Sequence, residues 1–137
     1  MVYITRRERF NAAHKLSNPA WDQATNEKIF GKCSNPNWHG HNYDLFITVK
    51  GEIDQERGWV IDLKDLSDLV NKKIINELDH KNLNLDVPFM KDKWASTEVL
   101  AFEIWNILAP EIVKMGAQLH CIKLMETENN YAEYYGE

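Results

Sequence analysis

The chain has 137 residues, of which 44% are hydrophobic and 27% charged, and its formal net charge is −5. This length and composition predict a single globular domain, residues 1–137, that is large enough to bury a core. With no basic cluster, nucleic acid is not expected as a partner. With no long apolar run or leader, we expect a cytoplasmic protein without a membrane span. Two cysteines are too few for a disulfide framework.

The first half of the chain predicts two strands separated by a long loop. Residues 2–10 are rich in β-formers although their centre is charged, and residues 42–50 alternate apolar and polar side chains. Residues 17–38 hold Asn, Pro, Gly and Asp, which predicts a loop with a short helix around residues 22–29. Loops of this length in a small domain are usually functional.

The second half predicts two helices and a hairpin. After a short extended piece at residues 59–61, Asp62 is a good N-cap for an amphipathic helix. The second helix is expected to start at Ser96 or Thr97 and to end or kink near Ala109, before Pro110. Two further strands, residues 119–126 and 130–135, read as a closing hairpin.

This order, β-β-α-α-β-β, predicts an α+β fold with an antiparallel sheet and two helices on one face. Such a sheet has two open edges, and exposed edges favour pairing with another chain. We therefore expect a homo-oligomer in which sheets join into a larger barrel.

The strongest chemical motif is G-K-C-S-N-P-N-W-H-G-H-N-Y at residues 31–43. On a strand, His39 and His41 point to one face, so both imidazoles can reach one point. His14 lies upstream in F-N-A-A-H. Each histidine could be a structural residue. Together they suggest a metal site, with zinc favoured by imidazole ligands. Three histidines with an open position are typical of catalytic zinc, and four closed ligands of structural zinc.

Three other places carry candidate chemistry. Cys33 is a buried small side chain, a fourth zinc ligand or a thiolate base. Asp79-His80 is either a solvated pair at a helix end or a proton-transfer histidine steered by a carboxylate. Glu126 is either a polar strand end or a carboxylate that accepts hydrogen bonds from an amino-heterocycle.

The chain resembles the 6-pyruvoyltetrahydropterin synthase family along almost its whole length. The matching segments, in order, are R-F-N-A-A-H (9–14), F-G-K-C-S-N-P-N-W-H-G-H-N-Y (30–43), G-E-I-D (51–54), L-D-H-K-N-L-N (78–84), S-T-E (96–98) and E-T-E-N-N (126–130). Each is weak alone, but their order and spacing together are specific. The resemblance implies the tunnelling fold (T-fold), trimers or dimers of trimers that close a barrel, and pockets between subunits.

The resemblance also implies a role for each matching residue. The zinc ligands fall on His14, His39 and His41. The thiol base falls on Cys33, and its acid–base partner on Asp79 and His80. The pterin ring would be bound by the residues Glu126, Ser96 and Thr97.

The implied reaction is the zinc-dependent lyase conversion of 7,8-dihydroneopterin triphosphate to 6-pyruvoyltetrahydropterin. The sister 6-carboxytetrahydropterin synthases of deazapurine biosynthesis act on the same substrate but typically carry C-x3-H-x-H, whereas Cys33 and His39 give C-x5-H-x-H. A non-catalytic zinc or pterin-binding assembly domain is a third hypothesis. Trp38 stands where relatives often have Gly. The candidate triphosphate contacts are not ranked by the sequence: Arg9, Lys15, Lys28 and Lys32.

Overall fold

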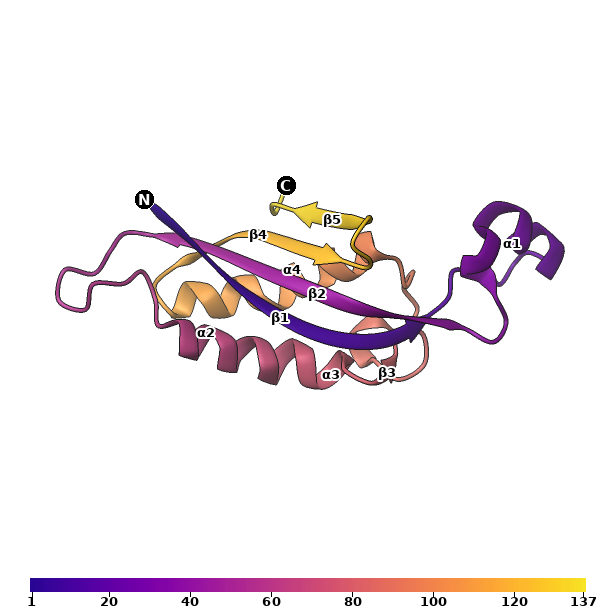
Figure 1. Cartoon of the computed structure of the whole chain (residues 1–137), viewed down its shortest axis with the longest axis horizontal. Helices are drawn as coiled ribbons and strands as arrows, with labels where there is room; N and C mark the ends of the chain where they lie inside the picture. The colour runs from indigo at the N-terminus through magenta and orange to yellow at the C-terminus, as the bar shows by residue number, and fades with distance from the viewer.

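The computed structural model describes residues 1–137 as a five-stranded sheet with helices packed on one face (Figure 1). The strands, in chain order, are β1 (Val2–His14), β2 (His39–Gly51), β3 (Lys81–Asn82), β4 (Gln118–Met125) and β5 (Tyr131–Tyr134). Their order in the sheet is β3-β1-β2-β4-β5. Neighbours are antiparallel except β1 and β3, which are parallel. The α+β class is confirmed, and β3 is a strand that the sequence did not predict.

The helices form one layer beneath the sheet, apart from one that projects from its end (Figure 1). Those in the layer are α2 (Leu63–Val70), α3 (Asn76–Leu78) and α4 (Thr97–Lys114), with a π-helical turn at Asn71–Ile75 joining the first two. The projecting helix is α1 (Gln23–Phe30), which runs into a 3-10 turn at Gly31–Ser34. A second 3-10 turn spans Pro88–Met90. The predicted short helix in the long loop is thus confirmed.

Both long helical segments begin where the sequence predicts. The Asp62 carboxylate accepts a hydrogen bond from the Lys64 N–H at 2.8 Å, and the Ser96 hydroxyl accepts one from Val99 at 3.3 Å. The predicted end of α4 near Ala109 is wrong, because the helix continues through Pro110 to Lys114.

Packing explains why Pro110 does not end α4. Proline removes one helical hydrogen bond, but Leu108 and Ile112 on either side of it are completely buried. Their burial favours a continuous helix by about 1.5–3 kcal/mol per side chain. Residues 59–61 are also not the extended piece that the sequence predicted. They form bends, and the Trp59 carbonyl accepts the Asp54 N–H at 2.9 Å to close a turn.

Strands β1 and β2 are longer than predicted, and the extra length matters for function. The sequence pattern placed them at residues 2–10 and 42–50, whereas they pair continuously until His14 lies opposite His39. The added residues include Ala and Gly, which carry little strand propensity. Cross-strand backbone pairing, which the local pattern does not encode, extends the two strands.

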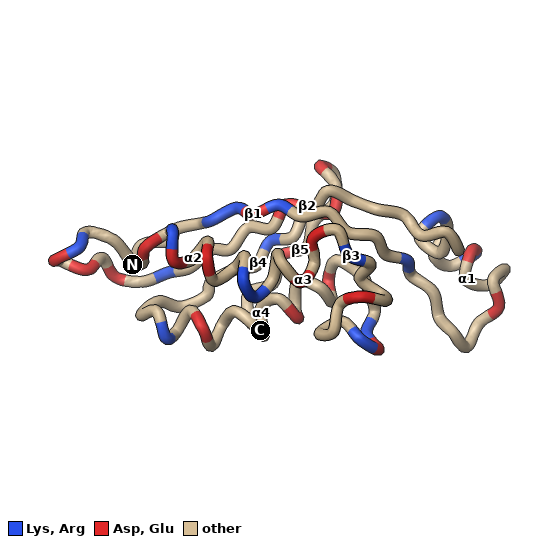
Figure 2. Tube along the Cα trace, turned by 90° about the horizontal axis from the view of Figure 1, so that it is seen from below, with Lys and Arg blue, Asp and Glu red and all other residues tan.

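The core lies between the sheet and the helices. On β2 the side chains Tyr43, Leu45, Ile47 and Val49 point into it and are at most 1% exposed. Basic positions gather along β1 (Figure 2). Here Arg9 approaches Asp44 at 2.8 Å. None of the helices combines the length and hydropathy needed to cross a membrane.

Candidate active site and metal centre

The three candidate zinc ligands come together at one end of the β1–β2 pair. His14 lies opposite His39 in the antiparallel register, and His41 follows two residues along β2, so all three share the helix-facing side of the sheet. The ring centroid of His14 is 4.5 Å from that of His39 and 5.0 Å from that of His41. The predicted grouping of the three histidines is therefore present in the structure.

The tautomer of His14 is fixed by a backbone group from far along the chain. Its Nδ1 lies 2.6 Å from the Ala95 carbonyl oxygen, 81 residues away. A carbonyl only accepts, so Nδ1 carries the proton and Nε2 keeps its lone pair. A metal-binding histidine usually has this arrangement, in which the second nitrogen donates to an oxygen.

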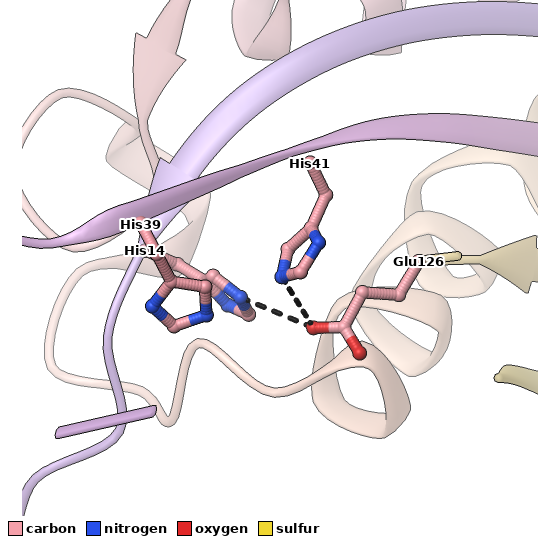
Figure 3. A group of neighbouring side chains, drawn as sticks. All are labelled: His14, His39, His41 and Glu126. Carbon is pink, nitrogen blue, oxygen red and sulfur yellow. Dashed lines mark ion pairs between the residues drawn. The ribbon is translucent and has the colours of Figure 1, made fainter. Parts of the chain in front are cut away.

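Glu126 completes the group of four side chains drawn in Figure 3. It directly follows β4, and its Oε1 is 3.1 Å from Nε2 of both His14 and His41. One ligand atom from each of the three histidines and Glu126 lies within 4.8 Å of the others. From the sequence, Glu126 is either a polar strand end or a carboxylate for a heterocycle, and its position among the histidines was not predicted.

The environment of the ring nitrogens indicates that the group can hold a metal ion. Nε2 of His14, Nδ1 of His39 and Nε2 of His41 are buried and make no hydrogen bond. Glu126 Oε1 lies 3.1 Å from the first and the last of these nitrogens, but an unprotonated nitrogen has no proton to donate to it. Buried polar atoms are rarely left in this way. Burial also lowers the pKa of both His39 and His41, which keeps these imidazoles neutral and able to bind a cation. Imidazole nitrogens with one carboxylate oxygen are a ligand set that suits zinc.

Cys33 borders a cavity of about 430 Å³ whose wall also includes His14 and Glu126. The cysteine lies in the 3-10 turn after α1 and is partly buried, with a free thiol. Its carbonyl accepts the Leu16 N–H at 2.8 Å, which ties this turn to the segment after β1. The thiol is thus beside the histidine group but is not one of the four clustered ligand atoms.

The start of α4 forms another wall of the same cavity. Ser96 and Thr97 both line it, together with Glu98. The Ser96 hydroxyl caps the helix, and the carboxylate of Glu98 is exposed in the first turn. Glu98 was not among the predicted site residues, although the S-T-E segment at residues 96–98 contains it.

Asp79 and His80 lie apart from Cys33. His80 Nδ1 is 3.0 Å from the Asp79 carboxylate, whose other oxygen accepts the Asn11 N–H at 3.0 Å. That backbone hydrogen bond lowers the pKa of the Asp79 carboxyl. The pair borders a different hollow, of about 700 Å³, which also includes His41 and Glu126. Within one chain the structure therefore joins Asp79 to His80 but does not bring either into the Cys33 cavity.

The backbone holds His80 outward. Its φ is 61°, in the left-handed region, and its N–H donates to the Asn11 carbonyl at 2.8 Å. Its side chain is 76% exposed. A non-glycine residue in this conformation costs free energy and is often functional.

Two further residues lie beside the site, of which the sequence singled out Trp38 but not Tyr43. Tyr43 continues the same alternation as His39 and His41, and its ring stacks on Phe10 at 4.8 Å. Its hydroxyl is buried without a partner, and burial raises its pKa. The strand alternation could have identified it. Trp38 has a φ of 69°, and its ring lies 4.2 Å from Lys15 Nζ. This left-handed backbone explains why glycine suits position 38.

Comparison with known proteins gives consistent matches over the full chain. The family model described as 6-pyruvoyl tetrahydropterin synthase matches residues 3–137. The chain is 45% identical to the 6-pyruvoyl tetrahydrobiopterin synthase of Pongo abelii and 43% identical to that of Homo sapiens. Each alignment spans 134 residues, which is 98% of this chain and 91% of the relative.

A solved structure shows the same arrangement of elements. The Caenorhabditis elegans 6-pyruvoyl tetrahydropterin synthase superposes with a TM-score of 0.86 at 32% identity, covering 99% of this chain and 96% of that one. An uncharacterized protein from Wolinella succinogenes, at 16% identity and a TM-score of 0.74, shares the fold.

Proposed function

The chain belongs to the 6-pyruvoyl tetrahydropterin synthase family, and from this membership we propose that it is a zinc-dependent carbon–oxygen lyase of tetrahydrobiopterin synthesis. It would convert 7,8-dihydroneopterin triphosphate to 6-pyruvoyltetrahydropterin and release triphosphate. The observation that carries the proposal is the set of three buried imidazole nitrogens that make no hydrogen bond, beside a cavity that Cys33 also borders.

The metal would be held by His14, His39 and His41. When bound there, zinc supplies Lewis-acid chemistry, which acidifies the hydroxyl and adjacent C–H groups of the substrate side chain. The Ala95 carbonyl supports this role for His14 by fixing its tautomer, and burial supports it for His39 and His41 by keeping both neutral.

Proton transfer is assigned to Cys33 and His80. The Cys33 thiolate would remove a proton from the substrate side chain, and His80, oriented by Asp79, would act as its acid–base partner. Protons return to the pterin ring as triphosphate leaves by elimination. The side chain is oxidised while the ring is reduced, so the reaction needs no external oxidant or reductant.

Recognition of the pterin ring is assigned to Glu126, Ser96 and Thr97. A carboxylate can accept two hydrogen bonds from the 2-amino group and the ring N–H, which gives orientation as well as affinity. All three residues border the cavity that holds Cys33, and this supports a common role.

We further propose that residues 1–137 form one domain and that copies of it assemble as a trimer or a dimer of trimers. Both outer strands, β3 and β5, have one edge without a partner strand. A shared site also accounts for the separation of Cys33 from His80 into different hollows, because a neighbouring chain could supply the missing half.

One experiment decides between the two sister reactions. The purified protein, loaded with zinc, is incubated with 7,8-dihydroneopterin triphosphate, and the pterin product is identified by mass spectrometry. We expect a product that keeps the three side-chain carbons, as the spacing of Cys33 and His39 favours. Release of acetaldehyde with a 6-carboxy product would show instead the 6-carboxytetrahydropterin synthase reaction.

A second candidate function has one observation in its favour. Glu126 lies close enough to the histidines to make a closed set of four ligands, which is typical of structural zinc. A structural site would make the domain an assembly or pterin-binding module. It leaves the Asp79–His80 pair and the neighbouring cysteine without a role.

A further inference from the structure

The carboxylate of Glu126 lies beside the histidines, whereas the proposed function assigns it to the pterin ring. Its Oε1 lies 3.1 Å from Nε2 of His14 and 3.1 Å from Nε2 of His41 (Figure 3). This places the oxygen between two nitrogens that face the same point. With His39 included, the four ligand atoms form a compact set, and a cation bound there would have a carboxylate oxygen within reach.

Nothing else holds this carboxylate in place. The Glu126 backbone is fixed, because its N–H donates to the Asn130 carbonyl at 3.1 Å. Its side chain accepts no hydrogen bond from any backbone N–H or hydroxyl group, and the two imidazoles are its close polar contacts. The side chain is 21% exposed and borders both the Cys33 cavity and the hollow beside His80. It can therefore turn from the imidazoles into either space while the backbone stays fixed.

The two tasks exclude each other. A carboxylate that accepts two hydrogen bonds from a flat amino-heterocycle must present both oxygens to the ring edge. A carboxylate that closes the fourth position of a tetrahedral zinc site takes the position that a substrate oxygen would otherwise occupy. We propose that Glu126 is an exchangeable ligand, which closes the metal site in the resting protein and moves to the heterocycle when the ring binds.

This inference rests on the proposed function, since it takes a pterin as the ligand of the cavity. It adds a coupling between ring binding and metal coordination, which the lyase reaction itself does not require. Binding of the ring alone, without any side chain, would be enough to release the fourth position. The site would then be reactive only when a ring of the right chemistry has been recognised.

The test uses the whole 137-residue chain loaded with Co²⁺, whose visible absorption reports the number and type of ligands. The ring analogue is 6-methylpterin, which has no side-chain hydroxyls to bind the metal. We expect Glu126→Gln and Glu126→Ala to alter the cobalt spectrum and to weaken Co²⁺ binding at least tenfold in competition with a chelator. Addition of 6-methylpterin to the unsubstituted protein should shift its spectrum toward that of Glu126→Ala.

Glu98→Gln is the matched control, because Glu98 borders the same cavity but does not approach the histidines. It should leave the cobalt spectrum and the metal affinity unchanged. Circular dichroism checks that each variant is folded, and the near-isosteric Glu126→Gln serves if the alanine variant is not.

Two outcomes would overturn the exchange. If Glu126→Gln binds Co²⁺ with unchanged affinity and spectrum, the carboxylate is not a ligand. If equilibrium dialysis shows that 6-methylpterin binds while the spectrum stays constant, the ring does not displace it. Either result would contradict the exchange alone and would leave the proposed lyase function standing. Absence of any pterin binding is a different result, because it removes the proposed function and the exchange together.

Discussion

The histidine group and the Asp79–His80 pair are two halves of a proposed site that the chain builds in opposite ways. The three imidazoles are mostly buried and set by strand register, and His14, at 1% exposure, is held by the Ala95 carbonyl. His80 is 76% exposed on a left-handed backbone, with Asp79 as its side-chain partner. One chain supplies all the clustered ligand atoms of the histidine group, whereas His80 of the Asp79–His80 pair faces open space.

This contrast indicates which functions a single chain can perform. Metal binding needs a few atoms within a small sphere, and the paired ends of β1 and β2 supply them. Proton transfer through Cys33 and His80 needs groups that here border different hollows. We therefore expect a lone chain to bind metal and an assembled one to catalyse.

The largest effect is expected from removing one imidazole. His41→Ala should reduce zinc affinity by more than the ~10–100-fold that loss of an outer-shell partner costs, and turnover should disappear with it. The measurement is zinc content after dialysis against a weak chelator. His120→Ala is the control, because that histidine packs between Tyr3 and Tyr135, away from the group. A full equivalent of zinc in His41→Ala would contradict the assignment.

Removing the thiol should separate catalysis from metal binding. Cys33→Ala is expected to keep zinc and to lose about 10²–10⁴-fold in turnover, the usual contribution of a positioned base. Cys121→Ala, at the other free cysteine, should retain turnover. The measurements are zinc content and steady-state rate. Loss of metal from Cys33→Ala would mean that the thiol is a ligand.

Mixing two inactive variants tests whether the halves come from different chains. If Cys33 of one chain works with His80 of another, co-refolded Cys33→Ala and His80→Ala should regain a measurable fraction of wild-type turnover. Mixing Cys33→Ala with the Cys33→Ala/His80→Ala double variant is the control and should give none. Equal inactivity in both mixtures would place the whole site within a single chain.

The smallest effect concerns the pH dependence of stability. The hydrogen bond from the Asn11 N–H lowers the pKa of Asp79 in the folded state. Its contribution to stability is therefore fully present above the ordinary carboxyl value of about 3.9 and is lost as pH falls toward the lowered value. Asp79→Asn should flatten the stability curve below about pH 4 without changing zinc content, as measured by urea unfolding. An unchanged slope would indicate that Asp79 titrates alike in both states.

The sequence anticipated the parts of the site that depend on short-range geometry. His39 and His41 share a face because of strand alternation, and Ser96 begins a helix because its hydroxyl caps it. The position of His14 opposite His39 followed from pairing that extended both strands beyond their local pattern.

Long-range contacts explain most of what the sequence did not predict. The Ala95 carbonyl is a backbone group, so no residue type marks its role beside His14. The approach of Glu126 to two imidazoles depends on how β4 ends beside β2. Likewise, the continuation of α4 through Pro110 is a result of core packing that overrides local propensity.

Removal of the metal tests the central claim most directly. The zinc-loaded protein is treated with a chelator, and its far-UV circular dichroism and its turnover of 7,8-dihydroneopterin triphosphate are followed together, before and after zinc is restored. The account predicts a folded protein that is inactive without zinc and recovers when zinc returns. Unfolding on metal removal would contradict it and indicate structural zinc, because a structural ion contributes folding free energy directly. Full activity without metal would contradict it as well.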